Sequence, residues 1–407
     1  MGGFKVSRYA KAVTTPDPSP IRIGYCLSLS GALGGNGQSA RLAHEIWQED
    51  VNRSGGLLGR PVELVCYDDG TDASQVEGLY RRLLDEERVD IVVGGYGTNT
   101  LRPAMPLVIK RRRFFVGLMG LGVNGDFGYP GYFAMIPTGP DPNAALTEGF
   151  FAVAAAQSPR PVTVALVIAD AEFARNPAIG AKANAEQYGF TIVREVRYPL
   201  ATTNFTAIVD EVAETSCDLL FLCSYLTDSI ELIRALRAHS FRPKMVGGAM
   251  IGPQNASVKI TLGPLLNGVV NYEYWAPVPS MITPAARAML EVYQIRAAGI
   301  GVDPLGHYMA PLAYAQMQVV AQAVEATGSL DDDTLISYAR AATFRTVMGD
   351  VAFGPNGEWR ESRVLQVQFR GIVGNSAHQF KDGLRQVVVA PRHMASGTVI
   401  FPYALAL

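Results

Sequence analysis

Residues 21–69, IRIGYCLSLSGALGGNGQSARLAHEIWQEDVNRSGGLLGRPVELVCYDD, contain a strand pattern, a glycine-rich stretch, a helix pattern and a second strand pattern, in that order. The runs at 21–29 and 61–69 are short and apolar, whereas 38–53 has the spacing of an amphipathic helix. A strand–helix–strand unit of this kind predicts a parallel sheet that is covered by helices.

The same alternation continues along the chain and then starts again. Further strands are expected at 89–95 and 113–119, with helices at 73–87 and 99–111. After residues 138–143, strands are expected at 161–170, 190–199, 217–225 and 244–248, with helices at 173–188, 204–215 and 226–239. The sequence therefore predicts an α/β protein with two similar lobes, each a parallel sheet flanked by helices.

Bulk composition excludes several classes of function. The net charge of −2 gives no electrostatic basis for nucleic-acid binding, and the basic run 110–113 is expected at a helix end, where it complements the helix dipole. No apolar stretch approaches the roughly 20 residues that span a bilayer, so direct membrane insertion is not expected. The first 20 residues lack a hydrophobic signal core. Either an export signal was removed or replaced, or the protein is cytosolic.

The four cysteines show no metal-binding pattern. None forms a Cys-x-x-Cys pair or has a histidine at ligand spacing, so no metal site is expected. Cys26, Cys66 and Cys223 fall in apolar runs, which favours buried free thiols, and a structural disulfide stays possible for an exported protein.

The glycine-rich stretch raises the question of a dinucleotide site. Gly35, Gly37 and Ala40 fit the pattern G-x-G-x-x-[G/A]. However, Gly35 comes six residues after Leu29, where the strand is expected to end, so SGALGGNG is interpreted as a loop rather than a tight turn. The acidic residue expected about 20 positions on is also missing there, and the later pair at 68–69 is interpreted as a solvated turn. No cofactor is therefore expected, and a nucleotide-dependent dehydrogenase is the least favoured function.

No catalytic constellation appears among the five histidines. None pairs at His-x-x-x-His spacing, and His44 and His307 are expected to have structural roles. The loops after the expected strands instead carry small hydrogen-bonding side chains and a few aromatic residues, which suits a small-molecule ligand. These residues include Ser30, Tyr96, Thr98, Asn99, Phe173 and Tyr225.

The order of these pieces resembles one known family. The stretch 21–69, the stretch GGYGTNTLRPAMPLVIKRRRFFVGL and the later GDVAFGPNGE are similar to type I periplasmic solute-binding proteins of ABC transporters, in the branched-chain amino acid (leucine/isoleucine/valine)-binding branch. The resemblance covers roughly residues 21–390. It implies a non-enzymatic protein whose two lobes close on a ligand by a hinge motion.

The resemblance also implies lobe boundaries. Lobe one is expected to comprise 21–139 plus 269–345, and lobe two 140–268 plus 346–390. Residues 1–20 are expected to be a disordered or artificially added segment, and 391–407 a C-terminal tail. The three crossings between the lobes are expected near 138–142, 267–275 and 344–351.

Site residues follow from the resemblance position by position. Thr98 and Asn99 match the positions that bind the ligand carboxylate, and the next loop offers only backbone groups, from Gly120 to Gly122. Tyr225 matches a lobe-two aromatic residue that closes over the ligand, and Phe173 matches a second wall position.

One position departs from the family pattern. Amino-acid binders carry an acidic residue after the fourth lobe-two strand, where this chain has Met250, which cannot pair with an ammonium group. Glu273 or Asp170 would have to replace that acid. Together with Tyr272, Tyr274 and Trp275, Met250 predicts a more apolar pocket, for a carboxylate or amide with a hydrophobic or aromatic body.

Two classes of function stay open at this point. One is a periplasmic binding protein that delivers a small molecule to ABC permease subunits. The other is a cytosolic ligand sensor of the same fold, as in amide-responsive regulators.

Overall fold

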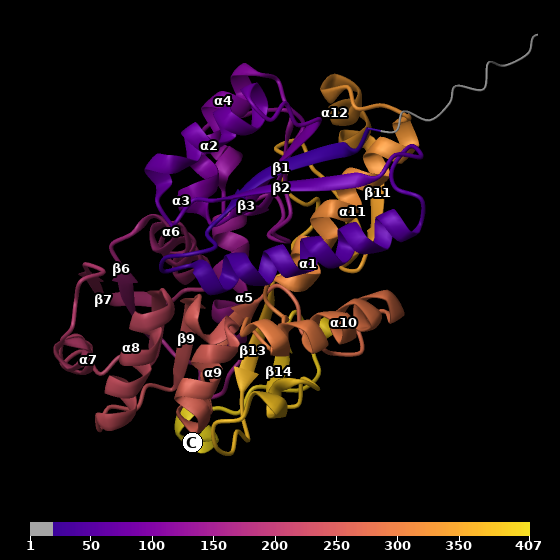
Figure 1. The fold of residues 1–407 in the computed structure, drawn as a ribbon. Helices are drawn as coiled ribbons and strands as arrows, with labels where there is room; N and C mark the ends of the chain where they lie inside the picture. The colour runs from indigo at the N-terminus through magenta and orange to yellow at the C-terminus, as the bar shows by residue number, and fades with distance from the viewer. Residues whose placement is uncertain (1–18) are drawn as a thin grey trace, which may run out of the picture.

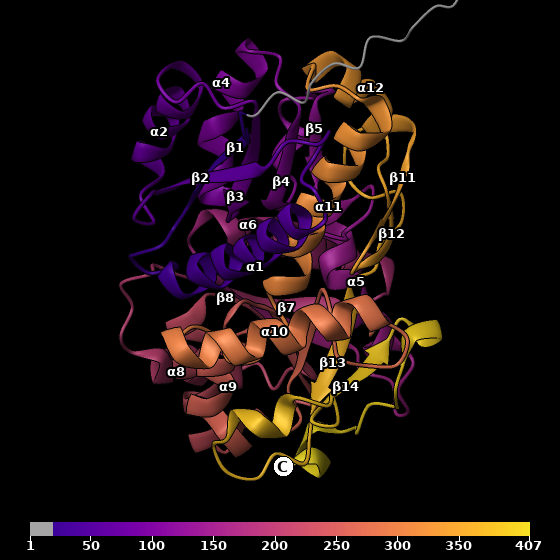
Figure 2. The ribbon, with the colours of Figure 1, turned by 45° about the vertical axis from the view of Figure 1, so that its right-hand side comes forward.

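Two β-sheets, one above the other in Figures 1 and 2, organise the chain. The structure is a computed structural model that describes residues 19–407. The smaller sheet has the order β2-β1-β3-β4-β5, and all its pairings are parallel. Its strands are β1 Ile21–Leu27, β2 Val62–Asp68, β3 Ile91–Tyr96, β4 Phe115–Met119 and β5 Tyr132–Ala134.

Helices cover both faces of this sheet and complete lobe one. Helices α1 (Gly34–Arg53) and α11 (Ala310–Thr327) pack on one face, and α2 (Ala73–Asp85) and α4 (Met105–Lys110) on the other. Helix α10 (Pro284–Ile300) lies against α1, and α12 (Asp332–Ala341) and the hairpin β11–β12 (Thr343–Thr346, Gly349–Ala352) follow α11.

The larger sheet has the order β14-β13-β10-β9-β8-β6-β7. Its strands are β6 Thr163–Ala169, β7 Thr191–Tyr198, β8 Leu219–Ser224, β9 Met245–Met250, β10 Val270–Glu273, β13 Leu365–Phe369 and β14 Gln386–Ala390. Helices α5 (Pro142–Ala155) and α6 (Glu172–Gln187) cover one face, and α7 (Phe205–Ala213), α8 (Leu226–Ala238) and α9 (Ala256–Leu262) the other. The four strands from β6 to β9 are parallel, as predicted; β10 adds a fifth parallel strand, and β13 and β14 add an antiparallel edge, none of which was predicted in this sheet.

The chain passes between the sheets after β5, after β10 and after β12. The first passage, between β5 and α5, spans residues 135–141. Strand β10 pairs within the larger sheet, although its residues fall in the range 269–345 that was predicted for lobe one. Strand β12 pairs with β11 beside α11, although its residues fall in the range 346–390 that was predicted for lobe two. The pairings of these short strands thus differ from the predicted assignment, and residues 1–18 of the predicted N-terminal segment lie outside the described residues.

Helix α1 begins at Gly34, so the prediction that SGALGGNG is a loop is wrong for its second half. Glycine is a poor helix former, and the pattern of residue types therefore hid the first turn. A tertiary contact explains the glycine: a Cβ on Gly37 would lie 1.9 Å from the carbonyl oxygen of Ser28. The helix can begin this close to the end of β1 only because residue 37 has no side chain.

The expected helix at 99–111 is also wrong as a single element. It is divided into α3 (Thr98–Leu101), a 3₁₀ turn at 102–104 and α4. Pro103 and Pro106 lie in this stretch, and each removes a backbone N–H donor that a continuous helix would need.

A buried polar bridge fastens α1 and α11 to the smaller sheet. The side chain of Gln316 is fully buried, and its amide nitrogen donates to the carbonyl oxygens of Gly94 (2.8 Å) and Val116 (2.7 Å). Its oxygen lies 3.0 Å from Nε2 of His44. Burial lowers the pKa of His44 to about 3, so this imidazole is neutral at physiological pH. His44 therefore has the structural role that was predicted for it.

The four cysteines are free thiols in the structure. Cys26, Cys217 and Cys223 are buried and Cys66 is partly buried.

Two glycines in the first turn of α1 provide a matched test of this packing. We expect Gly37→Ala to lower the free energy of unfolding by about 1–3 kcal/mol, because overpacking forces the helix away from Ser28. Gly35 has no atom within 4 Å of its Cβ position, so Gly35→Ala should be neutral or stabilising by up to about 1 kcal/mol. Urea denaturation of both variants measures the difference, and equal effects of the two substitutions would contradict the close approach.

Candidate functional site

The first loop of the site is held by two aspartates at the end of β2. Oδ1 of Asp68 accepts hydrogen bonds from the backbone N–H groups of Leu29 (2.8 Å), Ser30 (3.2 Å) and Gly70 (2.8 Å), and Oδ2 accepts from the Ser30 hydroxyl (2.7 Å). Asp69 is buried and accepts from the Ser28 hydroxyl at 2.5 Å. Asp68 is exposed, as predicted for a solvated turn, but the prediction is wrong for Asp69, which is buried against a partner 41 residues earlier in the chain.

A cluster of buried tyrosines lies where the two sheets approach each other. Tyr96 at the end of β3 accepts a hydrogen bond from Nδ2 of Asn36 (2.8 Å), and its hydroxyl is 3.2 Å from that of Tyr308. On the lobe-two side, the rings of Tyr272 and Tyr274 are 5.2 Å apart. Burial raises the pKa of all four phenols, and the charges of Tyr96 and Tyr274 contribute to the increase for Tyr272. We call Tyr96, Tyr272, Tyr274 and Tyr308 the tyrosine cluster.

A second set of contacts connects the lobes beside α3. Nδ2 of Asn176 on α6 donates to the carbonyl oxygen of Leu121 at 3.1 Å. Burial raises the pKa of Tyr225, and an interaction with the Asn99 side chain partly opposes this increase. The Tyr225 hydroxyl accepts a hydrogen bond from the N–H of Phe173 (3.0 Å), and the two rings are 6.0 Å apart at 76°. The predicted residues Asn99, Phe173 and Tyr225 are therefore brought together.

Thr98 and the glycines after β4 shape the opposing loop. The Thr98 hydroxyl accepts from the N–H of Leu121 at 3.0 Å, so it is occupied within the protein. A Cβ on Gly120 would lie only 2.6 Å from the Val123 side chain, so the packing at position 120 requires glycine. Gly122 has a φ of 63°, and its Cβ position is 3.6 Å from Oδ1 of Asn143 in lobe two.

Ser30 and Met250 are less exposed to a ligand than the sequence suggested. The Ser30 hydroxyl is bound by Asp68. Met250 is fully buried at the end of β9, where its backbone exchanges hydrogen bonds with the Asn271 side chain (3.1 and 2.9 Å).

Neither carboxylate proposed to replace the missing acid is free. Glu273 is buried, accepts from Nε2 of Gln386 at 2.9 Å and lies 3.8 Å from the buried Nζ of Lys259. Asp170 pairs with Arg175 at 3.0 Å. Both groups are satisfied within lobe two.

A cavity of about 230 Å³ opens at the mouth of this cleft. Lobe one contributes the start of α1, including Leu33 and Asn36, and lobe two contributes Leu226 and residues of α9 such as Ile260. Asn36, which lines this cavity, also donates a hydrogen bond to Tyr96 of the tyrosine cluster.

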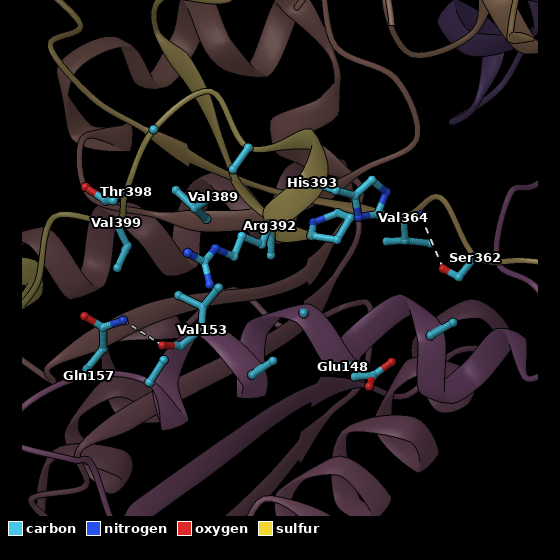
Figure 3. A pocket seen from close by; sticks show the side chains of 18 residues that line it. Glu148, Val153, Gln157, Ser362, Val364, Val389, Arg392, His393, Thr398 and Val399 are labelled. Carbon is cyan, nitrogen blue, oxygen red and sulfur yellow. Dashed lines mark hydrogen bonds between the residues drawn. The ribbon is translucent and has the colours of Figure 1, made fainter. Parts of the chain in front are cut away.

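A larger hollow of about 810 Å³ lies elsewhere, on lobe two (Figure 3). Glu148 and Val153 of α5, with Gln157 just after this helix, line one side, and Val389, Arg392 and His393 line the other. None of the predicted site residues contributes to it.

Three residues of the cleft were not predicted from the sequence: Asn36, Asn176 and Tyr308. Asn36 lies within the glycine-rich stretch, which was the available signal. Nothing in the local sequence distinguishes Asn176 or Tyr308, whose partners lie in the other lobe or more than 200 residues away.

Within residues 19–407, no three or more His, Cys, Asp or Glu side chains are gathered as a metal site. No helix in that range combines the length and apolarity needed to cross a bilayer.

Comparison with known proteins identifies relatives along nearly the whole chain. The family described as "Periplasmic binding protein" matches residues 20–370. The "Leu/Ile/Val-binding protein homolog 8" of Brucella abortus is 24% identical over 374 residues, covering 89% of this chain and 91% of that protein. The proteins matched here are named as binding proteins, not as enzymes.

Solved structures share the fold. The branched-chain amino acid substrate-binding protein LivJ from Streptococcus pneumoniae, in complex with isoleucine, has a TM-score of 0.72 at 17% identity, covering 88% of this chain and 97% of that one. A solute-binding protein from R. palustris in complex with benzoate has a TM-score of 0.74 at 14% identity, covering 91% and 96% respectively.

Asp68 should make stability depend on pH. Partial burial alone would raise its pKa, but hydrogen bonds from Ser30, Gly70 and Leu29 outweigh burial and lower the pKa. The pKa of an aspartate in the unfolded chain is about 4. Because the pKa of Asp68 is lower than this in the folded state, its ionised form stabilises the folded state at pH values above about 4, and this stabilisation is lost as the pH falls through the folded-state pKa. We expect Asp68→Asn to cost about 1 kcal/mol at pH 7 and progressively less below pH 4.

Urea denaturation at pH 7 and pH 3 measures this dependence. Asp382→Asn is the control, because Asp382 is an exposed aspartate that accepts a hydrogen bond from the N–H of Leu384. If Asp68→Asn lowered the free energy of unfolding by the same amount at both pH values, the ionised carboxylate of Asp68 could not be the stabilising form.

Proposed function

This chain belongs to the periplasmic binding protein family, and from that membership we propose that it is the ligand-binding component of an ABC uptake system. It clamps a small carboxylate or amide with a hydrophobic or aromatic body between its lobes, in the periplasm, and delivers it to permease subunits. The observation that carries the proposal is that side chains from both lobes meet around one cleft, at the tyrosine cluster and at Asn99, Phe173 and Tyr225.

The chemistry of the cleft supports this class of ligand. Tyrosine and phenylalanine rings supply apolar walls, and Asn36, Asn99 and the backbone around Gly122 supply hydrogen-bonding groups. Two proteins of similar fold hold isoleucine and benzoate, and both ligands combine a carboxylate with an apolar body. Met250 leaves no carboxylate at the position where amino-acid binders have an acidic residue, which favours a ligand without a strict need for an ammonium partner there.

Binding by lobe closure follows from thermodynamics. A ligand stabilises the closed arrangement only by the free energy of contacts that it makes there and not in the open arrangement. Polar contacts between the lobes, such as the one from Asn176 to Leu121, would add to the contacts that the ligand makes in the closed arrangement.

A thermal-shift screen tests the proposal. The panel contains branched-chain and aromatic amino acids, their deaminated acids, benzoate and benzamide. A ligand that binds only the folded state raises Tm, so we expect at least one compound to raise it, with isothermal titration calorimetry giving one site per chain. A panel in which no compound shifts Tm would contradict the proposed ligand class.

Tyr225 should then be a determinant of affinity. We expect Tyr225→Ala to weaken binding of the best ligand by about tenfold or more, the equivalent of 1.4 kcal/mol, because an aromatic wall and an interlobe contact are lost together. Tyr188→Ala is the control, since Tyr188 is a partly buried tyrosine that donates to Glu148 on the outer side of lobe two. Equal affinities of the two variants would place the site away from Tyr225.

A further inference from the structure

The hollow on lobe two has the size of a ligand site and lies apart from the cleft (Figure 3). Its volume of about 810 Å³ is typical of pockets that enclose small molecules. Its walls come from α5, from the end of β14 and from the segment 391–399 that follows β14. No residue that lines the cavity at the cleft mouth also lines this hollow.

Small side chains on one face of α5 create this space. Four lining residues are spaced four, three and four positions apart, so they lie along one face of the helix and its C-terminal end: Ala145, Gly149, Ala152 and Ala156. A Cβ on Gly149 would lie only 2.5 Å from Cγ of Gln366 on β13, so glycine lets α5 approach the sheet here. Larger side chains on this face would fill the hollow.

The opposite wall, the segment after β14, is held in place by hydrogen bonds. The N–H groups of Ser396 and Gly397 donate to the carbonyl oxygen of Val388 at 2.9 and 3.3 Å. In return, the N–H of Val388 donates to the Ser396 hydroxyl at 3.0 Å. Just beyond the hollow, the N–H of Ile400 donates to Oε1 of Gln368 on β13 at 2.7 Å. These bonds fasten the segment to the sheet and give the hollow a defined shape.

The apolar part of the lining is aliphatic. Four valines line the hollow from its two sides: Val153, Val364, Val389 and Val399. Among residues 19–407, no Phe, Tyr or Trp side chain lines it. The cleft differs, because tyrosine and phenylalanine rings form its walls. A ligand with an aliphatic chain therefore matches the hollow, whereas an aromatic ring would find no stacking partner there.

One cation of the hollow is unpaired. The exposed side chain of Arg392 extends into the hollow, and its guanidinium group makes no hydrogen bond or ion pair within the described part of the chain. The carboxylate on the α5 side, that of Glu148, accepts a hydrogen bond from the Tyr188 hydroxyl at 3.2 Å. A guanidinium group without a partner can bind a carboxylate through two parallel hydrogen bonds.

We propose that this hollow is a second ligand site, which binds an aliphatic monocarboxylate. The chain of the ligand lies on the small side chains of α5 and on the valines, and Arg392 pairs with its carboxylate. Burial of the chain removes apolar surface from water, and the pair with Arg392 adds a charge-assisted hydrogen bond. The site does not depend on the proposed function, because it shares no residue with the cleft.

Three compounds with one chain length test the proposed chemistry. They are octanoate, 1-octanol and octylammonium, titrated into the wild type at pH 7.5 by isothermal titration calorimetry. We expect octanoate to bind at one site, and the other two about tenfold or more weakly, because they cannot form a charge-assisted hydrogen bond with a guanidinium group. Butanoate should also bind about tenfold or more weakly than octanoate, because it buries four fewer methylene groups.

Two substitutions separate the roles of the charge and the apolar lining. Arg392→Gln should weaken octanoate binding about tenfold and leave 1-octanol unchanged, whereas Ala152→Phe should weaken both by filling the hollow. The controls lie on α10 of lobe one and should keep the wild-type affinities. Arg287→Gln changes an exposed arginine without an ion pair within residues 19–407, and Ala288→Phe changes an exposed alanine. The ligand-free Tm shows whether each variant is folded.

Tyr225→Ala separates this site from the cleft, and it should bind octanoate as tightly as the wild type does. Octanoate binding that is lost in Tyr225→Ala but unchanged in Arg392→Gln would place octanoate in the cleft and overturn the inference. Equal affinities of octanoate and 1-octanol, or no binding of octanoate, would overturn it as well. The opposite failure, in which no compound of the thermal-shift panel depends on Tyr225, would contradict the proposed function and leave this second site intact.

Discussion

The close approach of α1 to the end of β1 is the constraint on which the rest of the site depends. Because Gly37 has no side chain, the helix begins within contact of the Ser28 carbonyl group. This position brings Asn36 to the Tyr96 hydroxyl and places Leu33 and Asn36 on the wall of the cavity at the cleft mouth. The aspartates at the end of β2 hold the connecting loop in the same place. One glycine thereby connects the packing of lobe one to the shape of the cleft.

The opposite side of the cleft is built from a different kind of interaction. Lobe two contributes aromatic rings and backbone groups, and its own buried charges, such as Lys259 and Glu273, are paired with each other. Between the lobes, the Asn176 side chain donates to the carbonyl oxygen of Leu121, and both groups are uncharged. A contact of this kind can break and form again without leaving a buried charge unpaired, which suits a hinge motion.

Much of the architecture could be predicted from the sequence. Alternating apolar strands and amphipathic segments located the eight predicted strands to within a few residues, and the polar and aromatic residues after the strands included Tyr96, Asn99 and Tyr225. Features that depend on distant partners were not accessible. The start of α1 is decided by Ser28, the burial of Asp69 by a partner 41 positions away, and the pairing of β10 by strands on both sides of it. Local composition carries none of this information.

The central claim is that one ligand contacts both lobes and holds them together. Small-angle X-ray scattering of the protein, with and without the compound that raises Tm most, tests it most directly. The account predicts that the ligand reduces the radius of gyration of the wild type. At a ligand concentration that saturates the wild type but not Tyr225→Ala, the radius of gyration of this variant should not change. A saturated wild-type protein whose radius of gyration is unchanged would contradict closure of the lobes on the ligand.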